Sequence, residues 1–253
     1  MIRRELLRGS LALAVLLTGC GVFGRDLPTY RYRLTVEVDT PEGLKRGSSV
    51  IEVRTAVAGS MKLPDANALA IRVTGEAVAV DLGKRGLLFA LLRREAIPQW
   101  AGGVMELVTQ RPPHDPDEDD YVAWHAAMIA NKGLHVIPRN SLISPRGYGE
   151  RMPTHRDPPA DYPMLVRFGD IADPTSVARV DPDDLAAPFG KGVKLRRITV
   201  ELTDDFVTTG IEMRLKWLPN HRGQLISATI ADSLEARALS SITEGDFVKD
   251  DLQ

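Results

Sequence analysis

Arg146, Tyr148, Arg151 and His155 are side chains, close together in the sequence, that could bind an anion. They lie in a stretch from residue 140 to 161 that is rich in proline and glycine, which indicates a long irregular loop. Long ordered loops often carry binding sites, and guanidinium groups pair well with carboxylates and phosphates. We therefore predict that these four side chains line a binding site. The alternative is an exposed connecting loop.

A run of acidic side chains from Asp115 to Asp120 alternates in the way that calcium-binding loops do. Such loops have a glycine at the sixth position and a glutamate at the twelfth, whereas this sequence has Asp120 and Ala126 there. We interpret the run as a solvated acidic loop before a helix predicted from Tyr121 to Asn131, where carboxylates stabilise the free N–H groups. The sequence predicts no metal site and no cofactor.

The histidines are too scattered to predict a zinc site, because no two of them have the close spacing of metal-ligand pairs. They are His114, His125, His135, His155 and His221. The sequence has no Gly-x-Ser-x-Gly motif, no Ser-x-x-Lys pair and no glycine-rich phosphate-binding loop. We interpret His125, on the apolar face of the predicted helix, as a core residue. A dispersed Asp/His hydrolase site remains the alternative, because catalytic triads are defined by geometry.

Cys20 is the only cysteine, and it follows three features that together are typical of an export signal. These are an arginine-containing start, an apolar core from Leu11 to Leu17, and the small residues Thr18 and Gly19. The apolar core is too short to cross a bilayer, which needs about 20 residues. At these positions the chain resembles a bacterial lipoprotein precursor with its lipobox. The resemblance implies a diacylglyceryl group on the sulfur of Cys20, cleavage before it and acylation of the new amine.

The residues around the cysteine also bear on export and location. By resemblance to enteric lipoproteins, an aspartate after the cysteine would favour the inner membrane, so Gly21 favours the outer membrane, facing the periplasm. Arg3 and Arg4 resemble a twin-arginine signal that lacks its preceding Ser or Thr, so general secretion is the preferred route. Residues 20–29 are predicted to be a lipidated tether. At about 3.3–3.6 Å per residue, it holds the first strand near the bilayer.

Composition favours one globular domain. The chain has 253 residues and a net charge of −2, and residues 1–19 carry +2 of charge, which leaves −4 on the rest. Such a mildly acidic chain is not expected to bind nucleic acid, which needs a concentrated basic surface. With Cys20 committed to lipid, no disulfide can form within the chain. We predict residues 30–253 to be a single domain, with a β-rich subdomain over 30–97 as the alternative division.

The fold class is predicted to be α+β, predominantly an antiparallel β-sheet or sandwich with a few helices. Apolar and polar residues alternate from Tyr30 to Asp39, which is typical of a strand with one buried face. Similar patterns predict strands over 49–57, 71–82, 87–92, 162–168 and 193–203. Tyr30 and Tyr32 share the apolar face of the first strand, so we interpret them as core residues rather than a ligand-stacking pair. Periodic apolar residues predict a C-terminal helix: Ile226, Ile230, Leu234 and Ile242.

These observations favour a membrane-anchored envelope lipoprotein that works without catalysis. The expected role is binding, or service as an accessory subunit of an assembly with an envelope protein as partner. The alternative is a membrane-tethered hydrolase with a dispersed Asp/His site.

Overall fold

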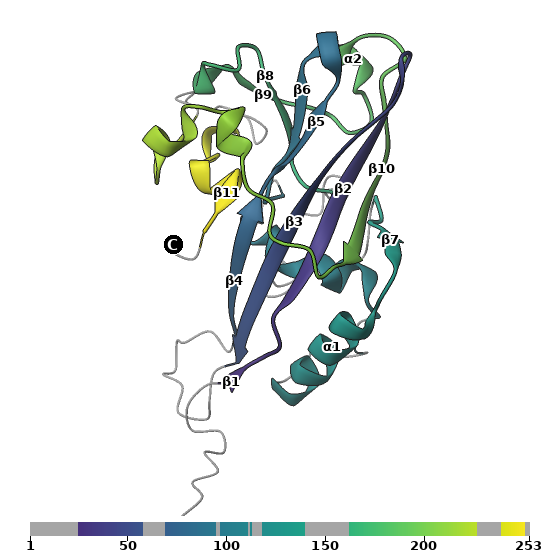
Figure 1. The fold of residues 1–253 in the computed structure, drawn as a ribbon, viewed down its shortest axis with the longest axis vertical. Helices are drawn as coiled ribbons and strands as arrows, with labels where there is room; N and C mark the ends of the chain where they lie inside the picture. The colour runs from purple at the N-terminus through teal and green to yellow at the C-terminus, as the bar shows by residue number, and fades with distance from the viewer. Residues whose placement is uncertain are drawn as a thin grey trace, which may run out of the picture.

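The computed structural model describes residues 25–57, 69–94, 97–110, 112, 118–139, 162–226 and 239–250. These residues form two antiparallel β-sheets with short helices around them (Figure 1), so the predicted α+β class with predominantly antiparallel sheet is confirmed. The molecule is elongated along the direction of the longest strands.

The main sheet has the strand order β11-β4-β3-β2-β10-β7, with β1 paired to β3. Its strands are β1 (Arg25–Asp26), β2 (Tyr30–Thr40), β3 (Gly43–Val57), β4 (Leu69–Glu76), β7 (Leu134–Val136), β10 (Lys194–Leu202) and β11 (Val248–Lys249). The alternation read in β2 is borne out by burial, since Tyr32, Leu34 and Val36 face the core. Their polar neighbours lie on the opposite face, which we call the outer face of the main sheet.

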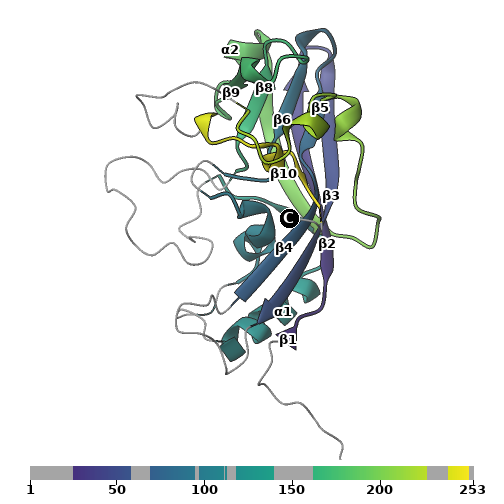
Figure 2. The ribbon, with the colours of Figure 1, turned by 90° about the vertical axis from the view of Figure 1, so that its left-hand side faces the viewer.

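The second sheet packs on the core face of the main sheet. Its order is β5-β6-β8-β9, and its strands are β5 (Val78–Asp81), β6 (Leu87–Ala90), β8 (Leu165–Phe168) and β9 (Val177–Arg179). The sheets approach closely at Gly47 of β3, where an added Cβ would lie 2.2 Å from the carbonyl oxygen of Ala79 in β5. Only glycine fits there. In Figure 2, β8 and β9 lie on one side of the main sheet, and the chain after β10 loops out on the other.

Helical segments close the lower end and the edges of the core. They are α1 (Glu118–Ala130), α2 (Ala186–Phe189) and the short 3₁₀ helices η1 (Gly83–Arg85), η2 (Trp100–Val108), η3 (Pro174–Ser176), η4 (Ile211–Met213), η5 (Leu218–His221) and η6 (Glu244–Asp246). The predicted helix from Tyr121 is therefore confirmed. It buries Tyr121, Trp124, His125 and Met128, which recur at helical spacing.

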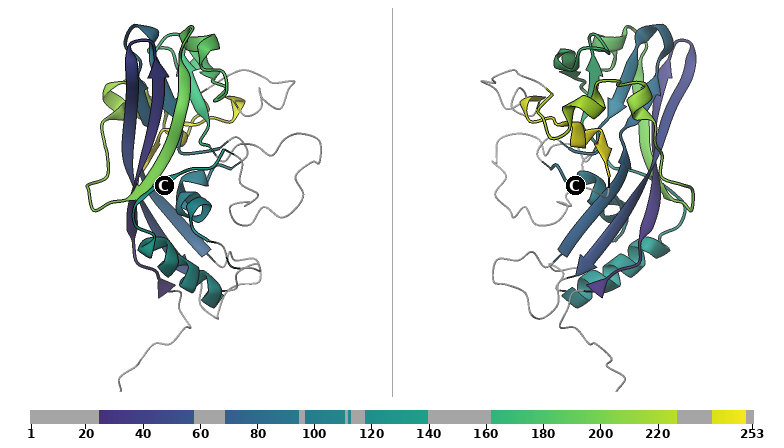
Figure 3. Two further views of the ribbon diagram at one scale, coloured as in Figure 1. Left: turned by 90° about the vertical axis from the view of Figure 1, so that its right-hand side faces the viewer. Right: turned by 60° about the vertical axis from the view of Figure 1, so that its left-hand side comes forward.

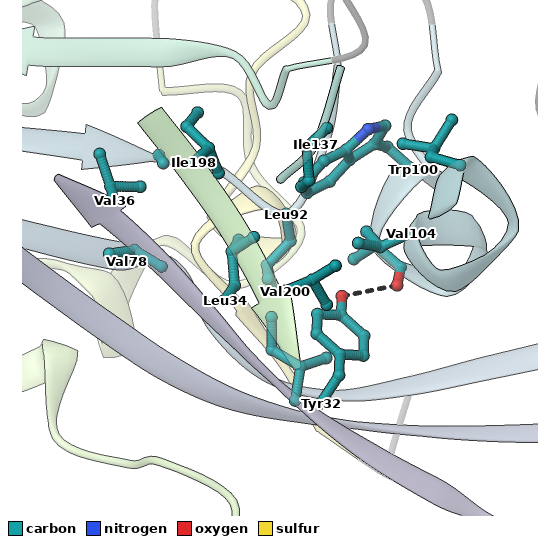
Figure 4. Packing of buried hydrophobic residues seen from close by; sticks show 14 of the residues in the cluster. Tyr32, Leu34, Val36, Val78, Leu92, Trp100, Val104, Ile137, Ile198 and Val200 are labelled. Carbon is teal, nitrogen blue, oxygen red and sulfur yellow. Dashed lines mark hydrogen bonds between the residues drawn. The ribbon is translucent and has the colours of Figure 1, made fainter. Parts of the chain in front are cut away.

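The core interpretation of the two tyrosines is confirmed. Tyr32 is fully buried, and its hydroxyl donates a hydrogen bond of 2.7 Å to the carbonyl oxygen of Ala101 in η2. Figure 4 shows this bond beside Trp100, Leu34 and other core side chains. Burial raises the pKa of Tyr32, so its hydroxyl stays protonated and keeps donating at any physiological pH. Tyr30 is also buried, against the ring of His125.

Two sequence predictions need correction. The predicted strand over 71–82 is two strands, because the chain leaves the main sheet after Glu76 and enters the second sheet as β5. The predicted C-terminal helix cannot run from Ile226 to Ile242, since a helix would separate them by about 24 Å. Instead, the N–H of Ile226 donates to the carbonyl of Ile242 at 2.9 Å. Residues 227–238, the centre of that prediction, lie outside the described residues.

Candidate functional site

The predicted binding residues Arg146, Tyr148, Arg151 and His155, and the predicted lipidation site Cys20, all lie outside the described residues. The loop site and the lipidation therefore stay predictions.

His125 is a core histidine, as interpreted from the sequence. It is 1% exposed, and its ring lies 5.7 Å from that of Tyr30 and 6.2 Å from that of Tyr121 between centroids. Asp119 and Asp120 lie in the first turn of α1, at the helix N-terminus as predicted, whereas residues 115–117 of the acidic run lie outside the described residues. Within the described part of the chain, no group of three or more His, Cys, Asp or Glu side chains could hold a metal ion.

A segment that the sequence did not single out crosses the outer face of the main sheet. It consists of residues 203–210, after β10 (Figures 1 and 3). The backbone N–H of Thr208 donates to the carbonyl of Val50 at 3.1 Å, and the N–H of Val50 donates to the Thr208 hydroxyl at 2.8 Å. Thr208 thus takes the place beside β3 that β4 leaves when it turns away after Glu76. The Glu76 carboxylate accepts from the N–H of Ile211 at 2.8 Å and so fixes the end of the segment.

The start of the segment is fixed as firmly as its end. The N–H of Thr203 donates to the carbonyl of Arg31 at 3.0 Å, which extends the β2–β10 ladder. The carboxylate of Asp205 pairs with the guanidinium of Arg33, and its carbonyl accepts from Nη1 of Arg31 at 3.4 Å. Asp205, just before Phe206, and Thr208, two residues after it, are therefore both held by hydrogen bonds to the sheet.

Phe206 is the most exposed large apolar side chain among the described residues, at 89%. An aromatic ring held out by a braced segment leaves its apolar area in water, although burial of such a ring stabilises by about 1.5–3 kcal/mol. Rings of this kind are typical of the anchors that carry most of the binding energy in protein interfaces. The sequence does carry a signal for this residue, because a phenylalanine follows two aspartates in a turn, where no core position is expected.

Two further apolar side chains are exposed on the same face. Leu134 and Val136 of β7 are 54% and 53% exposed, and they lie opposite Glu201 and Thr199 of β10. Glu201 in turn pairs with Arg33 at 3.5 Å, and Arg33 pairs with Asp205 beside Phe206. We define the outer-face patch as the apolar side chains Leu134, Val136 and Phe206 with the ionic group that lies among them: Arg33, Glu201 and Asp205.

A hollow of about 400 Å³ adjoins this patch. It is lined by Thr29, Tyr30, Arg31, Glu52, Ile129, Lys132, Leu202, Thr203 and Asp204. The lining combines apolar side chains with charged ones, among them Lys132, which follows two residues after the end of α1. Within the described residues the ammonium group of Lys132 makes no ion pair, so it is free to meet an acidic group of a partner. The hollow is therefore suited to hold a protruding side chain of a partner.

Glu52 lines the hollow and forms hydrogen bonds with two arginines on the outer face of the main sheet. One carboxylate oxygen accepts from Nε of Arg31 at 2.7 Å, and the other accepts from Nε of Arg54 at 2.9 Å. Burial raises the pKa of Glu52, but the hydrogen bonds and charges of the two arginines outweigh burial and hold the pKa below its usual range. Glu37 has its pKa lowered in the same way, mainly by its hydrogen bond from Arg197. These carboxylates are thus ionised and structural at neutral pH.

We expect Glu52 to make the protein less stable in acid. Because its folded pKa lies below its ordinary value of 4.5, its stabilising effect is complete above pH 4.5 and is lost as pH falls toward the folded pKa. Glu52→Gln should therefore flatten the fall in unfolding free energy below pH 4.5. Urea titrations of the wild-type and Glu52→Gln proteins between pH 3 and 7, at roughly unit steps, measure the slope of the unfolding free energy against pH for each protein. Equal slopes would show that the arginines do not favour the ionised carboxylate.

Comparison with known proteins adds no family. No protein-family model, no curated protein and no solved structure matches the chain. Within the described part of the chain, no helix is both long enough and apolar enough to cross a membrane.

Proposed function

We propose that this protein is a lipid-anchored envelope protein that works by binding a protein partner through the outer-face patch. The observation that carries the binding role is Phe206, which is almost fully exposed yet held on a segment braced at both ends. A preorganised anchor loses little conformational freedom on binding, so more of its burial energy is available for affinity. The lipid anchor rests on the sequence pattern that ends at Cys20.

The place of the patch suits a partner at the membrane. Arg25, the first residue of β1, comes five positions after Cys20, and five residue steps span at most about 18 Å. An acylated Cys20 would therefore hold the β1 end of the elongated molecule against the bilayer (Figure 1). The hollow is lined by Thr29 and Tyr30, which follow closely after β1. The site would then face the membrane-proximal space, where envelope proteins are the partners within reach.

The hydrolase alternative draws no support from His125. A hydrolase of that type needs a histidine beside a carboxylate in an open cleft. His125 is instead packed between two tyrosine rings in the core, where a substrate cannot reach it.

Photo-crosslinking in cells tests the proposal directly. We expect p-benzoylphenylalanine in place of Phe206 to give a crosslink to one envelope protein. The matched control is the same substitution at Leu44, which is also exposed but lies at the hairpin end of β3, opposite Asp39 of β2 and six residues from Val50. The proposal predicts a product at residue 206 that is absent at residue 44. The same set of products at both positions, or none at 206, would contradict it.

A further inference from the structure

We propose that the partner adds an extended segment to the free edge of β7, so that the main sheet continues into the partner. This inference rests on the proposed function, since β7 carries two of the apolar side chains of the outer-face patch. β7 is the last strand of the main sheet and lies beside β10 at its edge (Figure 1).

The register of β7 shows which of its backbone groups are free. The N–H of Ile137 donates to the carbonyl of Ile198 at 2.9 Å, and Val136 lies opposite Thr199. In an antiparallel ladder, hydrogen-bonded pairs alternate with pairs that do not bond to each other. His135 therefore bonds to β10, whereas the N–H and C=O groups of Leu134 and Val136 point away from it. Within the described residues no hydrogen bond to these outward groups is found.

The edge lacks the devices that usually keep strands apart. Natural edge strands carry charged side chains, prolines or bulges that prevent pairing with another chain. Over its three residues β7 has none of these, and it exposes Leu134 and Val136 on the outer face. Pro138 follows shortly after and confines the open edge to this short stretch. A partner segment would thus pair over a few residues only, while Phe206 supplies a second contact.

The chemistry of β7 defines the segment that fits it. Side chains alternate between the two faces of a sheet, so the partner's apolar residues must fall on the outer face beside Leu134 and Val136. Lys132 precedes the strand and forms no ion pair in the described part of the chain. The end of the partner segment that lies beside Lys132 should carry a carboxylate, which would pair with the Lys132 ammonium group. The predicted ligand is an extended peptide of alternating valine-like and polar residues with one acidic end.

A synthetic peptide tests this mode of binding. The probe is an acetylated and amidated heptapeptide of alternating valine and threonine with one terminal aspartate. Its control is the same peptide with methyl groups on alternate amide nitrogens, which blocks strand pairing. With the full chain, we expect the probe to slow amide hydrogen exchange at Leu134 and Val136 by roughly tenfold or more. The methylated control should leave the exchange unchanged.

A variant of the protein gives the second readout. Val136→Pro removes an outward donor and keeps the bonds of His135 and Ile137 to β10, because proline is tolerated on the open side of an edge strand. We expect Val136→Pro to bind the probe at least roughly tenfold more weakly, and Lys132→Ala to weaken it less. Unchanged exchange at Leu134 and Val136, or equal binding by Val136→Pro, overturns strand addition.

Failure of this inference can be told apart from failure of the proposed function. The crosslink from residue 206 depends on a partner at the outer-face patch but does not require strand pairing. If that crosslink forms equally in the Val136→Pro protein, the partner binds the patch by another mode. If the crosslink is missing from both proteins, the proposed function itself is wrong.

Discussion

Replacement of Cys20 by alanine is expected to leave an uncleaved and unlipidated precursor. The apolar core before Cys20 is too short to cross a bilayer, so firm attachment to the membrane should depend on lipid. Each buried CH₂ group contributes about 0.8 kcal/mol, so one acyl chain holds a protein marginally and two or three hold it stably. Loss of all chains therefore removes stable anchoring. The measurement is labelled palmitate incorporation in cells, together with the apparent mass of the product.

Thr18→Ala provides the matched control. It keeps a small residue in the same signal, so the precursor should be lipidated and cleaved as in the wild type. Normal palmitate labelling of the Cys20→Ala protein would contradict the lipoprotein assignment. Loss of labelling in both variants would instead point to a damaged export signal.

Asp246→Ala should destabilise the folded protein more than any surface substitution. The Asp246 carboxylate lies 3.2 Å from Nη1 of Arg93, and both side chains are 6% exposed. Arg93 also donates to the carbonyl of Ser241 at 2.9 Å, and Asp246 accepts from the N–H of Thr243 at 2.9 Å. Removal of the carboxylate breaks this buried ion pair and takes away the acceptor for the N–H of Thr243, and loss of one partner of a buried pair costs about 3–5 kcal/mol.

The loss should spread through the C-terminal segment, because Asp246 lies where that segment joins the core. Its carbonyl accepts from the N–H of Leu92, and the carbonyl of the fully buried Phe247 accepts from Ala77. Urea unfolding measures the change in free energy. Asp250→Ala is the control, since Asp250 pairs with Arg222 at 3.8 Å in a more exposed position, where such pairs contribute about 0–1 kcal/mol. Equal losses in the two variants would contradict a structural role for the buried pair.

The elements with strong local patterns could be predicted from the sequence. The alternation in β2 is set by the period of a strand, and the helical spacing in α1 by the period of a helix, so neighbouring residues suffice to reveal both. The pairing of β2 with β3 also followed from a short connection. The buried state of Tyr32 and His125 came from their place on those apolar faces.

Contacts between distant parts of the chain could not be predicted in this way. The passage of the chain from β4 to β5 brings Ala79 close to Gly47 of β3, a contact that no local pattern records. The 2.9 Å bond from Ile226 to Ile242 is likewise a contact that a helical spacing of apolar residues does not predict. The outer-face patch was missed for the same reason, because its members come from β7, β10, β2 and the segment after β10.

The affinity of the purified partner for the Phe206→Ala protein tests the account most directly. The ring is almost fully exposed, so its removal should change the unfolding free energy by no more than about 0.5 kcal/mol. If Phe206 anchors the partner, binding should weaken by about 2 kcal/mol, which is roughly thirtyfold in Kd. The account predicts this loss of affinity with unchanged stability. Equal affinity of the wild-type and Phe206→Ala proteins would contradict it.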